Sequence, residues 1–210
     1  MKLIITASIF LILFGFAEAI QRLTKIRHDL TRKFAHILSG TVVFFLPYFL
    51  NAREIIILAV TFAILLWISK YLGLLASIHK VNRKTLGEVF FPLGIGISAF
   101  FFLPHDLLAF QFGVLVLAFS DALAGIIGES FGKHKIFFLK STKSMEGSVV
   151  FFFATLILVM AMYSQRTLTS ILPMTVSSLL LTLIEMMLIG GLDNLLLPVV
   201  ASYIFKVVVL

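Results

Sequence analysis

Long apolar runs constrain this chain more than any other feature. A helix needs about 20 mainly apolar residues to cross the hydrocarbon core of a bilayer. We count eight candidate spans, with seven as the alternative, and their approximate positions are residues 3–20, 34–50, 54–70, 89–103, 107–128, 148–163, 168–189 and 194–210. This pattern predicts an all-α polytopic bundle of transmembrane helices. We expect it to form a single integral-membrane domain over residues 1–210.

The composition excludes several classes of protein. Of the 210 residues, 60% are apolar and only 13% are charged, whereas about a quarter are charged in a typical soluble domain. A soluble enzyme, a disordered chain and a coiled coil are therefore excluded. Cysteine is absent, which excludes disulfides, thiolate metal sites and cysteine nucleophiles. The fourth span carries Pro92, Gly94 and Gly96, and we expect a broken or re-entrant helix there.

The basic residues predict an orientation. The net charge is +7, and basic loops are retained on the cytoplasmic side of a membrane, so we expect no nucleic-acid partner. With the N-terminus outside, the inner loops hold most of the 17 basic residues. These are Arg22, Lys25, Arg27, Arg32, Lys33, Lys70, Lys80, Arg83, Lys84, Lys133, Lys135, Lys140 and Lys143. We therefore expect a site that faces the cytoplasm, in a bacterial or archaeal plasma membrane.

An acidic residue lies beside glycines near the inner end of the fifth span. Asp121, Gly125 and Gly128 share one face of a helix, where glycines let a ligand or another backbone approach closely. Two basic residues, Lys133 and Lys135, follow directly. This arrangement indicates a binding site for an anion. The alternative is a packing stripe of small residues with a paired aspartate.

A second polar segment comes directly before the sixth span. It runs Lys143-Ser144-Met145-Glu146-Gly147-Ser148. Free backbone N–H groups and the helix dipole at a helix start favour an anion, and Lys143 adds a positive charge. The segment therefore predicts a phosphate cradle, although its glycine spacing is not that of a Walker A loop. The alternative is a helix cap with a charged loop.

Further polar residues lie near the same membrane face. Arg32 and His36 share a helix face, with Lys33 one step round, and the two cations are suited to phosphate. The alternative is ordinary positive flanking with a buried, hydrogen-bonded histidine. Glu185 lies within a span, where a buried carboxyl group needs a partner or a proton. Asp193 and Asn194 offer oxygen ligands suited to Mg²⁺, but both are also good helix caps.

Together these segments resemble the family of phytol kinases and dolichol kinases, which are CTP-dependent polyprenol kinases of the membrane. The resemblance covers most of the chain. It rests on Arg32-Lys33-x-x-His36, Arg83 to Pro92, Asp121 to Lys133, Lys143-Ser144-x-Glu146-Gly147-Ser148, and Asp193-Asn194 with Pro198. The chain lacks the extra N-terminal spans of dolichol kinases. A substrate the size of phytol, geranylgeraniol or farnesol therefore fits the resemblance better than a dolichol.

The resemblance implies that a phosphoryl group passes from CTP to the hydroxyl of an isoprenoid alcohol in the membrane. It takes the segment from Phe131 to Ser148 as nucleotide-binding. The residues that we expect to bind the nucleotide are Arg32, Lys33, Gly128, Gly132, Lys133, Lys135, Lys143, Ser144, Glu146, Gly147 and Ser148. Phosphoryl transfer also needs Mg²⁺, for which the candidate ligands are Asp121, Glu129, Asp193 and Asn194. The catalytic candidates are Asp121, Glu185 and His36, and either acid is able to act as the base.

Other functions use the same parts. A phosphatidate cytidylyltransferase makes a CDP-lipid, but the Gly-Gly-x-x-Asp-Arg-x-Asp ending typical of that family has no clear match here. A diacylglycerol kinase differs only in its acceptor. A small transporter is a non-enzymatic alternative, although inverted repeats are not evident in the sequence. Dependence on CTP and Mg²⁺ distinguishes the enzymes from the transporter.

Overall fold

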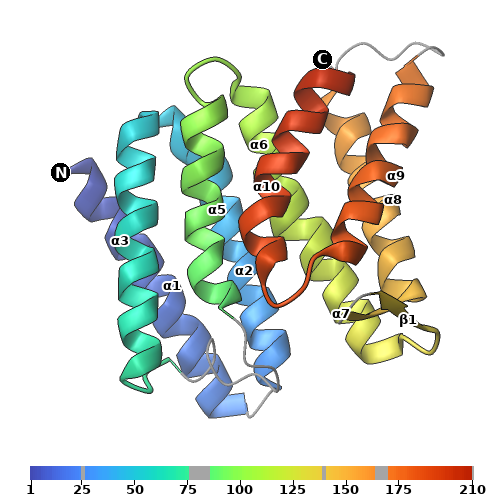
Figure 1. Cartoon of the computed structure of the whole chain (residues 1–210). Helices are drawn as coiled ribbons and strands as arrows, with labels where there is room; N and C mark the ends of the chain where they lie inside the picture. Colours follow the sequence, from blue (N-terminus) through green and yellow to red (C-terminus); the bar gives the residue numbers. More distant parts are fainter. Residues whose placement is uncertain (25–26, 76–85, 139–140, 164–169, 210) are drawn as a thin grey trace.

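Antiparallel helices form nearly all of the chain in its computed structural model (Figure 1). The structure describes residues 1–24, 27–75, 86–138, 141–163 and 170–209. Their α-helices are α1 (Lys2–Thr24), α2 (His28–Phe45), α3 (Ala52–Tyr71), α5 (Gly87–Phe102), α6 (Leu107–Leu115), α7 (Ala122–Phe131), α8 (Met145–Met162), α9 (Ile171–Met187) and α10 (Leu192–Ile204). A π-helical segment, η2 (Val116–Asp121), joins α6 to α7. The expected all-α bundle is confirmed.

Each of the eight predicted spans coincides with a helix or with a run of joined helices. Within the described ranges, five helical runs are long and apolar enough to cross a membrane: Lys2–Thr24, Ala52–Tyr71, Leu107–Phe131, Met145–Met162 and Leu192–Val209. The last run ends in a π-helical turn, η4 (Phe205–Val209). Two shorter apolar helices, Gly87–Phe102 and Ile171–Met187, lie among them. These lengths and compositions are those of an integral membrane protein.

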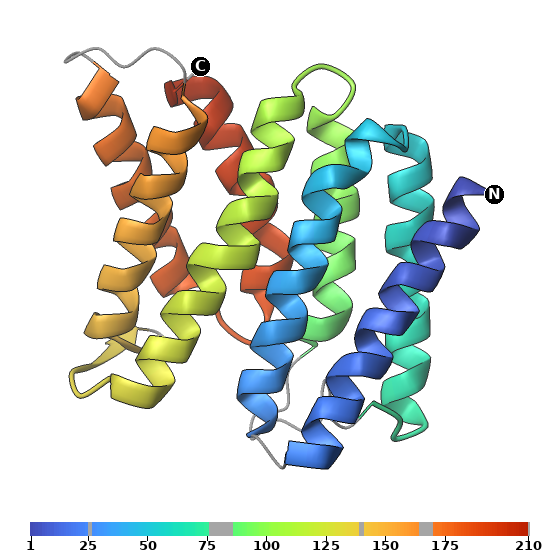
Figure 2. The same ribbon diagram turned by 180° about the vertical axis from the view of Figure 1, so that it is seen from behind.

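The bundle has two ends of different character (Figures 1 and 2). Both chain termini lie toward one end. The other end carries a short antiparallel hairpin, β1 (Lys135–Phe138) and β2 (Ser141–Ser144), in which Lys135 pairs with Ser144. We call this second end the hairpin end. The sequence analysis did not predict the hairpin, because four-residue strands without clear alternation carry little signal.

Side-chain caps define several helix ends at the loops. Asn51 and Glu54 form a capping box at the start of α3, in which each side chain accepts from the other residue's backbone N–H. Asp106 Oδ1 accepts from the N–H of Ala109 at the start of α6. At the turn before α10, Gly191 has a φ of +94°, which favours glycine. That turn brings the start of α10 against the start of α5.

The expectation that α5 is broken is wrong. The helix runs unbroken from Gly87 to Phe102 with Pro92 inside it. Pro92 lies only in the second turn, where few intrahelical hydrogen bonds precede it, so its cost is limited. Gly94 serves packing instead, because a Cβ atom there would lie 2.8 Å from the backbone oxygen of Leu195 in α10. The small residue therefore allows α5 and α10 to approach closely.

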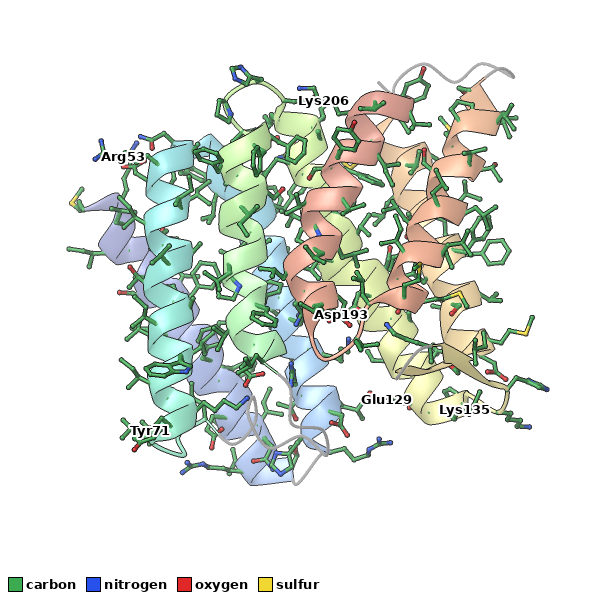
Figure 3. All side chains as sticks on the ribbon, viewed as in Figure 1. Arg53, Tyr71, Glu129, Lys135, Asp193 and Lys206 are labelled. Atoms are coloured by element: carbon green, nitrogen blue, oxygen red, sulfur yellow. The ribbon has the colours of Figure 1, made fainter. Side chains whose placement is uncertain are left out.

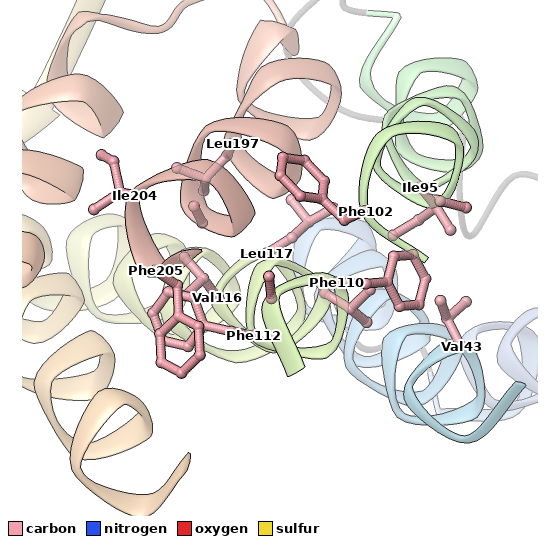
Figure 4. Packing of buried hydrophobic residues seen from close by; sticks show 14 of the residues in the cluster. Val43, Ile95, Phe102, Phe110, Phe112, Val116, Leu117, Leu197, Ile204 and Phe205 are labelled. Carbon is pink, nitrogen blue, oxygen red and sulfur yellow. The ribbon is translucent and has the colours of Figure 1, made fainter. Parts of the chain in front are cut away.

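The core surrounds the long run from α6 to α7 (Figure 4). In its most apolar window 72% of the residues are buried, against 17% in α1 at the edge of the bundle. The rings of Phe112 and Phe205 stack at a centroid distance of 4.4 Å and join this run to the C-terminal turn. Since Asp121 lies in the same run, the best-packed part of the molecule holds it in place.

Candidate active site

A lysine and an aspartate from distant segments form a buried pair near the hairpin end. Lys33 on α2 reaches Asp121 at the end of η2, with 2.8 Å between Nζ and Oδ2. The same Nζ donates to the backbone oxygen of Asp121 at 3.4 Å. Gly125 leaves room for the lysine, because a Cβ atom there would lie 2.6 Å from Lys33 Cε. The glycine face predicted beside Asp121 therefore accommodates a cation.

A second group joins β2 to α9 and α10. Lys143 Nζ pairs with Glu185 Oε1 and lies 3.8 Å from Asp193 Oδ2. Burial lowers the pKa of Lys143, but the two carboxylates outweigh burial and raise that pKa above its ordinary value. The ammonium group therefore stays charged at neutral pH. The partner that a buried Glu185 requires is Lys143, and its other oxygen, Oε2, is buried with no hydrogen-bond partner.

The two groups interact with each other. Asp121 is attracted to Lys143, and Asp193 is attracted to Lys33 and repelled by Asp121. We call Lys33, Asp121, Lys143, Glu185 and Asp193 the charged cluster. It holds three carboxylates and two ammonium groups, and its members come from α2, η2, β2, α9 and α10. Buried charges cost free energy, and those that a protein retains are concentrated at functional sites. The cluster is therefore the candidate active site.

A neighbouring polar group lies beside the cluster. Glu88 at the start of α5 binds Lys70 Nζ of α3 at 2.5 Å and lies 3.4 Å from Arg32 Nη2 of α2. Asn194 Nδ2 donates to the backbone oxygen of Gly87 at 2.7 Å. The sequence analysis did not assign Glu88 or Lys70 a role in the site, although Glu88 lies in the segment Arg83 to Pro92 on which the resemblance rests. The sequence signal for Lys70 is only that of a lysine at the end of a span.

His36 is held between α2 and the π-helical segment. Its Nε2 donates to the backbone oxygen of Leu117 at 3.0 Å. Its ring packs against Phe91, with centroids 4.4 Å apart. It also lies near enough to Asp121 and Lys33 to interact electrostatically with both. The structure thus shows the buried, hydrogen-bonded histidine that the sequence left as one alternative, and places it at the edge of the charged cluster.

The segment predicted as a phosphate cradle caps α8 and packs against α7. Ser144 Oγ accepts from the N–H of Gly147 at 3.1 Å. A Cβ atom at Gly128 would lie 2.7 Å from Ser144 Oγ, and the same holds at Gly132. The glycines therefore let the hairpin and the start of α8 lie directly on α7. Ser148 is also buried here, and its Oγ has no hydrogen-bond partner.

Other predicted residues lie on the outer surface of this end (Figure 3). Glu129, Lys133 and Lys135 are exposed. Glu146 Oε1 accepts from the N–H of Lys133 at 3.1 Å and from His134 Nδ1 at 2.8 Å. The structure does not bring these residues to Asp121. Five of the basic residues expected in the inner loops lie outside the described residues: Lys25, Lys80, Arg83, Lys84 and Lys140.

The predicted metal ligands do not converge on one point. Among the residues that the structure describes, there is no group of three or more histidine, aspartate or glutamate side chains able to hold a metal ion. Glu129 is exposed, and the amide nitrogen of Asn194 is bound to α5. Asp121 and Asp193 do repel each other within the charged cluster. Their carboxylates suit Mg²⁺, which needs only one or two when substrate phosphates supply the rest.

Comparisons with known proteins show the family of the chain. The cytidylyltransferase family matches residues 1–194 of the chain. A phytol kinase from Synechocystis sp. (strain ATCC 27184 / PCC 6803 / Kazusa) is 30% identical over 151 residues, which are 70% of this chain and 64% of that protein. The chain thus spans less than two thirds of that relative's length. No solved structure matches the chain. The resemblance to phytol kinases that the sequence motifs indicated is confirmed.

Proposed function

We propose that this chain, which belongs to the cytidylyltransferase family and is similar to a phytol kinase, is a membrane kinase that transfers a phosphoryl group from CTP to an isoprenoid alcohol. The similarity to a phytol kinase supports an alcohol of the size of phytol, geranylgeraniol or farnesol as acceptor. The observation that carries the proposal is the charged cluster. Its two largely buried cations would bind phosphate oxygens, and one of its three carboxylates would accept the proton of the alcohol.

The chemistry assigns a part to each member of the cluster. Lys33 and Lys143 would neutralise phosphate oxygens, since phosphoryl transfer depends mainly on positioning and on electrostatic stabilisation. The alcohol oxygen forms a bond to the γ-phosphorus as the bond to the CDP oxygen breaks. We assign the alcohol proton to Asp121, whose carboxylate pairs with Lys33 and interacts electrostatically with His36. The products are an isoprenoid monophosphate and CDP.

The carboxylate donors fit Mg²⁺ carried in by the nucleotide. Asp193 and Glu185 would hold the ion from the protein side, and the buried Glu185 Oε2 without a hydrogen-bond partner is available for such a role. When bound, Mg²⁺ would neutralise charge on the phosphates. Lys143 would then be released in part from the two acids that now hold it and would be free to contact phosphate.

The family's description favours one second function, the synthesis of a CDP-lipid. In that reaction a lipid phosphate attacks the α-phosphorus of CTP, and pyrophosphate leaves. The lipid phosphate would need no base, because it is already ionised. The charged cluster would again bind the phosphates, so the position of the label in the nucleotide is what separates the two reactions.

The test uses purified protein in detergent with Mg²⁺. γ-Labelled CTP, ATP, GTP or UTP is offered with phytol, geranylgeraniol, farnesol or diacylglycerol. We expect label in an isoprenoid monophosphate, and with CTP above the other nucleotides. A parallel reaction contains α-labelled CTP and phosphatidic acid. Label that appears only in a CDP-lipid would replace the kinase with the second function, and absence of both products from folded protein would overturn the proposal.

We further propose that the hairpin end faces the cytoplasm, on the ground that basic residues are retained there. Because the chain has no cysteine, single cysteines can report the orientation. Lys135 lies at the hairpin end, and Arg53 lies at the opposite end (Figure 3). In intact bacteria, a maleimide that cannot cross the membrane should label Arg53→Cys and should label Lys135→Cys only after permeabilisation. The reverse pattern would invert the orientation.

A further inference from the structure

Two neighbouring cavities lie between α1, α2, α3 and α5, and we call the pair the slot. The first has an empty volume of about 440 Å³ and the second of about 390 Å³, and both figures include space that is open to the surroundings. Four residues, one from each helix, line both cavities: Phe14, Ser39, Leu66 and Phe91. The two cavities therefore adjoin each other at these four side chains. Neither the charged cluster nor the predicted nucleotide segment accounts for this space.

The second cavity forms a polar mouth at the hairpin end. Arg32, His36, Glu88 and Asn194 contribute to its lining. Of these, His36 also interacts electrostatically with Asp121. His36 therefore borders the mouth of the slot and also lies close to the charged cluster.

The first cavity forms an apolar interior that follows α2 away from the mouth. Its lining includes Val43, Leu46, Ile55 and Leu58, all of them buried. Leu46, directly after the end of α2, is ten positions beyond His36, which corresponds to about 15 Å at 1.5 Å per residue. The slot thus reaches about half the thickness of a bilayer core. The apolar lining favours a hydrocarbon chain over a charged nucleotide.

One polar atom lies where the mouth meets the interior. Ser39 is 3% exposed, and its Oγ has no hydrogen-bond partner. A buried hydroxyl without a partner costs free energy, so a ligand that offers a hydrogen bond at this point would be favoured. A single hydroxyl at the end of a hydrocarbon tail has this chemistry.

We propose that this slot holds the tail of the acceptor alcohol, with the hydroxyl beside Ser39 and His36. The inference rests on the proposed function, because it assigns the second substrate of the same site. It adds that α1, α2, α3 and α5 select the alcohol by length, and that nucleotide and alcohol approach the charged cluster from different sides. Phospholipid acyl chains are the competing occupant that the test must distinguish.

The first experiment shortens the slot. Val43→Phe places a ring in the apolar interior, and Val42→Phe is the matched control, because Val42 is the adjacent residue on α2 and does not line either cavity. Phosphorylation of geraniol, farnesol and geranylgeraniol is compared. In Val43→Phe we expect kcat/KM for geranylgeraniol to fall about tenfold relative to that for geraniol. The control should change this ratio less than about twofold. An unchanged ratio in Val43→Phe would overturn the slot.

A second variant tests the hydroxyl. Ser39→Ala keeps the size of the side chain nearly constant and removes the one polar atom at the junction. We expect KM for farnesol to rise about two- to tenfold, the effect of one hydrogen bond, while KM for CTP does not change. Equal changes in both constants would assign Ser39 a structural role and would contradict its place beside the acceptor.

The last experiment needs no catalysis. A farnesol analogue that carries a diazirine in its tail is photolysed with the protein in nanodiscs, and the labelled peptides are mapped. We expect label on α2, α3 or α5 that farnesol suppresses and dioleoylphosphatidylcholine does not. Such label in a protein that phosphorylates no alcohol would refute the kinase and keep the slot. Label elsewhere, or suppression by the phospholipid alone, would refute the slot even where kinase activity is present.

Discussion

The charged cluster and the surface of the hairpin end differ in how their charges are held. In the cluster, Lys33 and Lys143 are largely buried and each pairs with a carboxylate from another segment. On the surface, Lys133 and Lys135 are exposed, and His134 binds Glu146, which is near it in sequence. The sequence analysis assigned all four lysines to the nucleotide. Because their settings differ, we expect the pair in the cluster to affect nucleotide binding more than the exposed pair does.

The physical reason lies in solvent screening. Water and salt weaken the attraction between an exposed charge and its partner. An exposed lysine therefore contributes little to the binding of a phosphate at a fixed point. A buried charge acts at a lower effective dielectric constant and is held in place by its partners. Substitution of a residue in the cluster is therefore expected to have a larger effect than substitution of an exposed residue of the same type.

The largest effect is expected at Asp121. In Asp121→Asn the side chain keeps its shape but loses the charge that binds Lys33 and the ability to accept a proton. We expect kcat for alcohol phosphorylation to fall about 10²–10⁴-fold, as when a general base is removed. The contrasting variant is Glu129→Gln, which alters an exposed carboxylate on the adjoining helix. Equal losses in both variants would remove the distinction between cluster and surface.

A smaller effect on nucleotide binding is expected at Lys143. We expect Lys143→Met to raise KM for CTP about 10- to 100-fold, whereas Lys135→Met should change it less than about threefold. Removal of one member of a buried ion pair costs about 3–5 kcal/mol, because Glu185 is left without its partner. Thermal unfolding of each variant must therefore accompany the kinetics.

A double variant separates binding from folding at this position. Lys143→Met with Glu185→Gln removes both charges of the pair, so we expect most of the stability to return. The high KM for CTP should remain. If KM returned with stability, the ammonium group would act only as a partner for Glu185, and the nucleotide would bind elsewhere.

The smallest effect is expected where the two regions touch. In Gly128→Ala the new Cβ atom would lie 2.7 Å from Ser144 Oγ, so the cap on α8 must shift. Loss of such a cap costs about 1 kcal/mol, or about 2–4 °C in Tm for a chain of this size. Gly15→Ala on α1 is the matched control, because nothing lies within 4 Å of its added Cβ. The control should keep or raise Tm. Equal Tm values would show that the hairpin does not depend on this contact.

The candidate site was predictable in part. Asp121 with its glycine face, the need of Glu185 for a partner and the alternative of a buried His36 all follow from single segments. The pairing of Lys33 with Asp121 does not, because 88 positions separate the two residues. Arg32, Glu88 and Lys70 likewise meet only because α2, α5 and α3 pack together.

Two local expectations show where sequence reasoning stops. Pro92, Gly94 and Gly96 predicted a broken helix, but α5 is unbroken. Gly94 packs against α10, and Gly96 packs against Ala59 of α3. The segment before α8 predicted either a phosphate cradle or a helix cap, and Ser144 does cap α8 through the N–H of Gly147, while the cradle stays a prediction. In both cases a residue type had two uses, and only its neighbours in space decide between them.

The sequence by itself determined the helices, the membrane class and the family, because apolar length and motif spacing are properties of consecutive residues. It also placed most acidic and basic groups near one end of the bundle. Only the tertiary structure decided which charges are buried, which acid each lysine binds and where a tail-sized slot opens. These features depend on the distance between side chains from separate helices, which packing sets and a linear pattern does not contain.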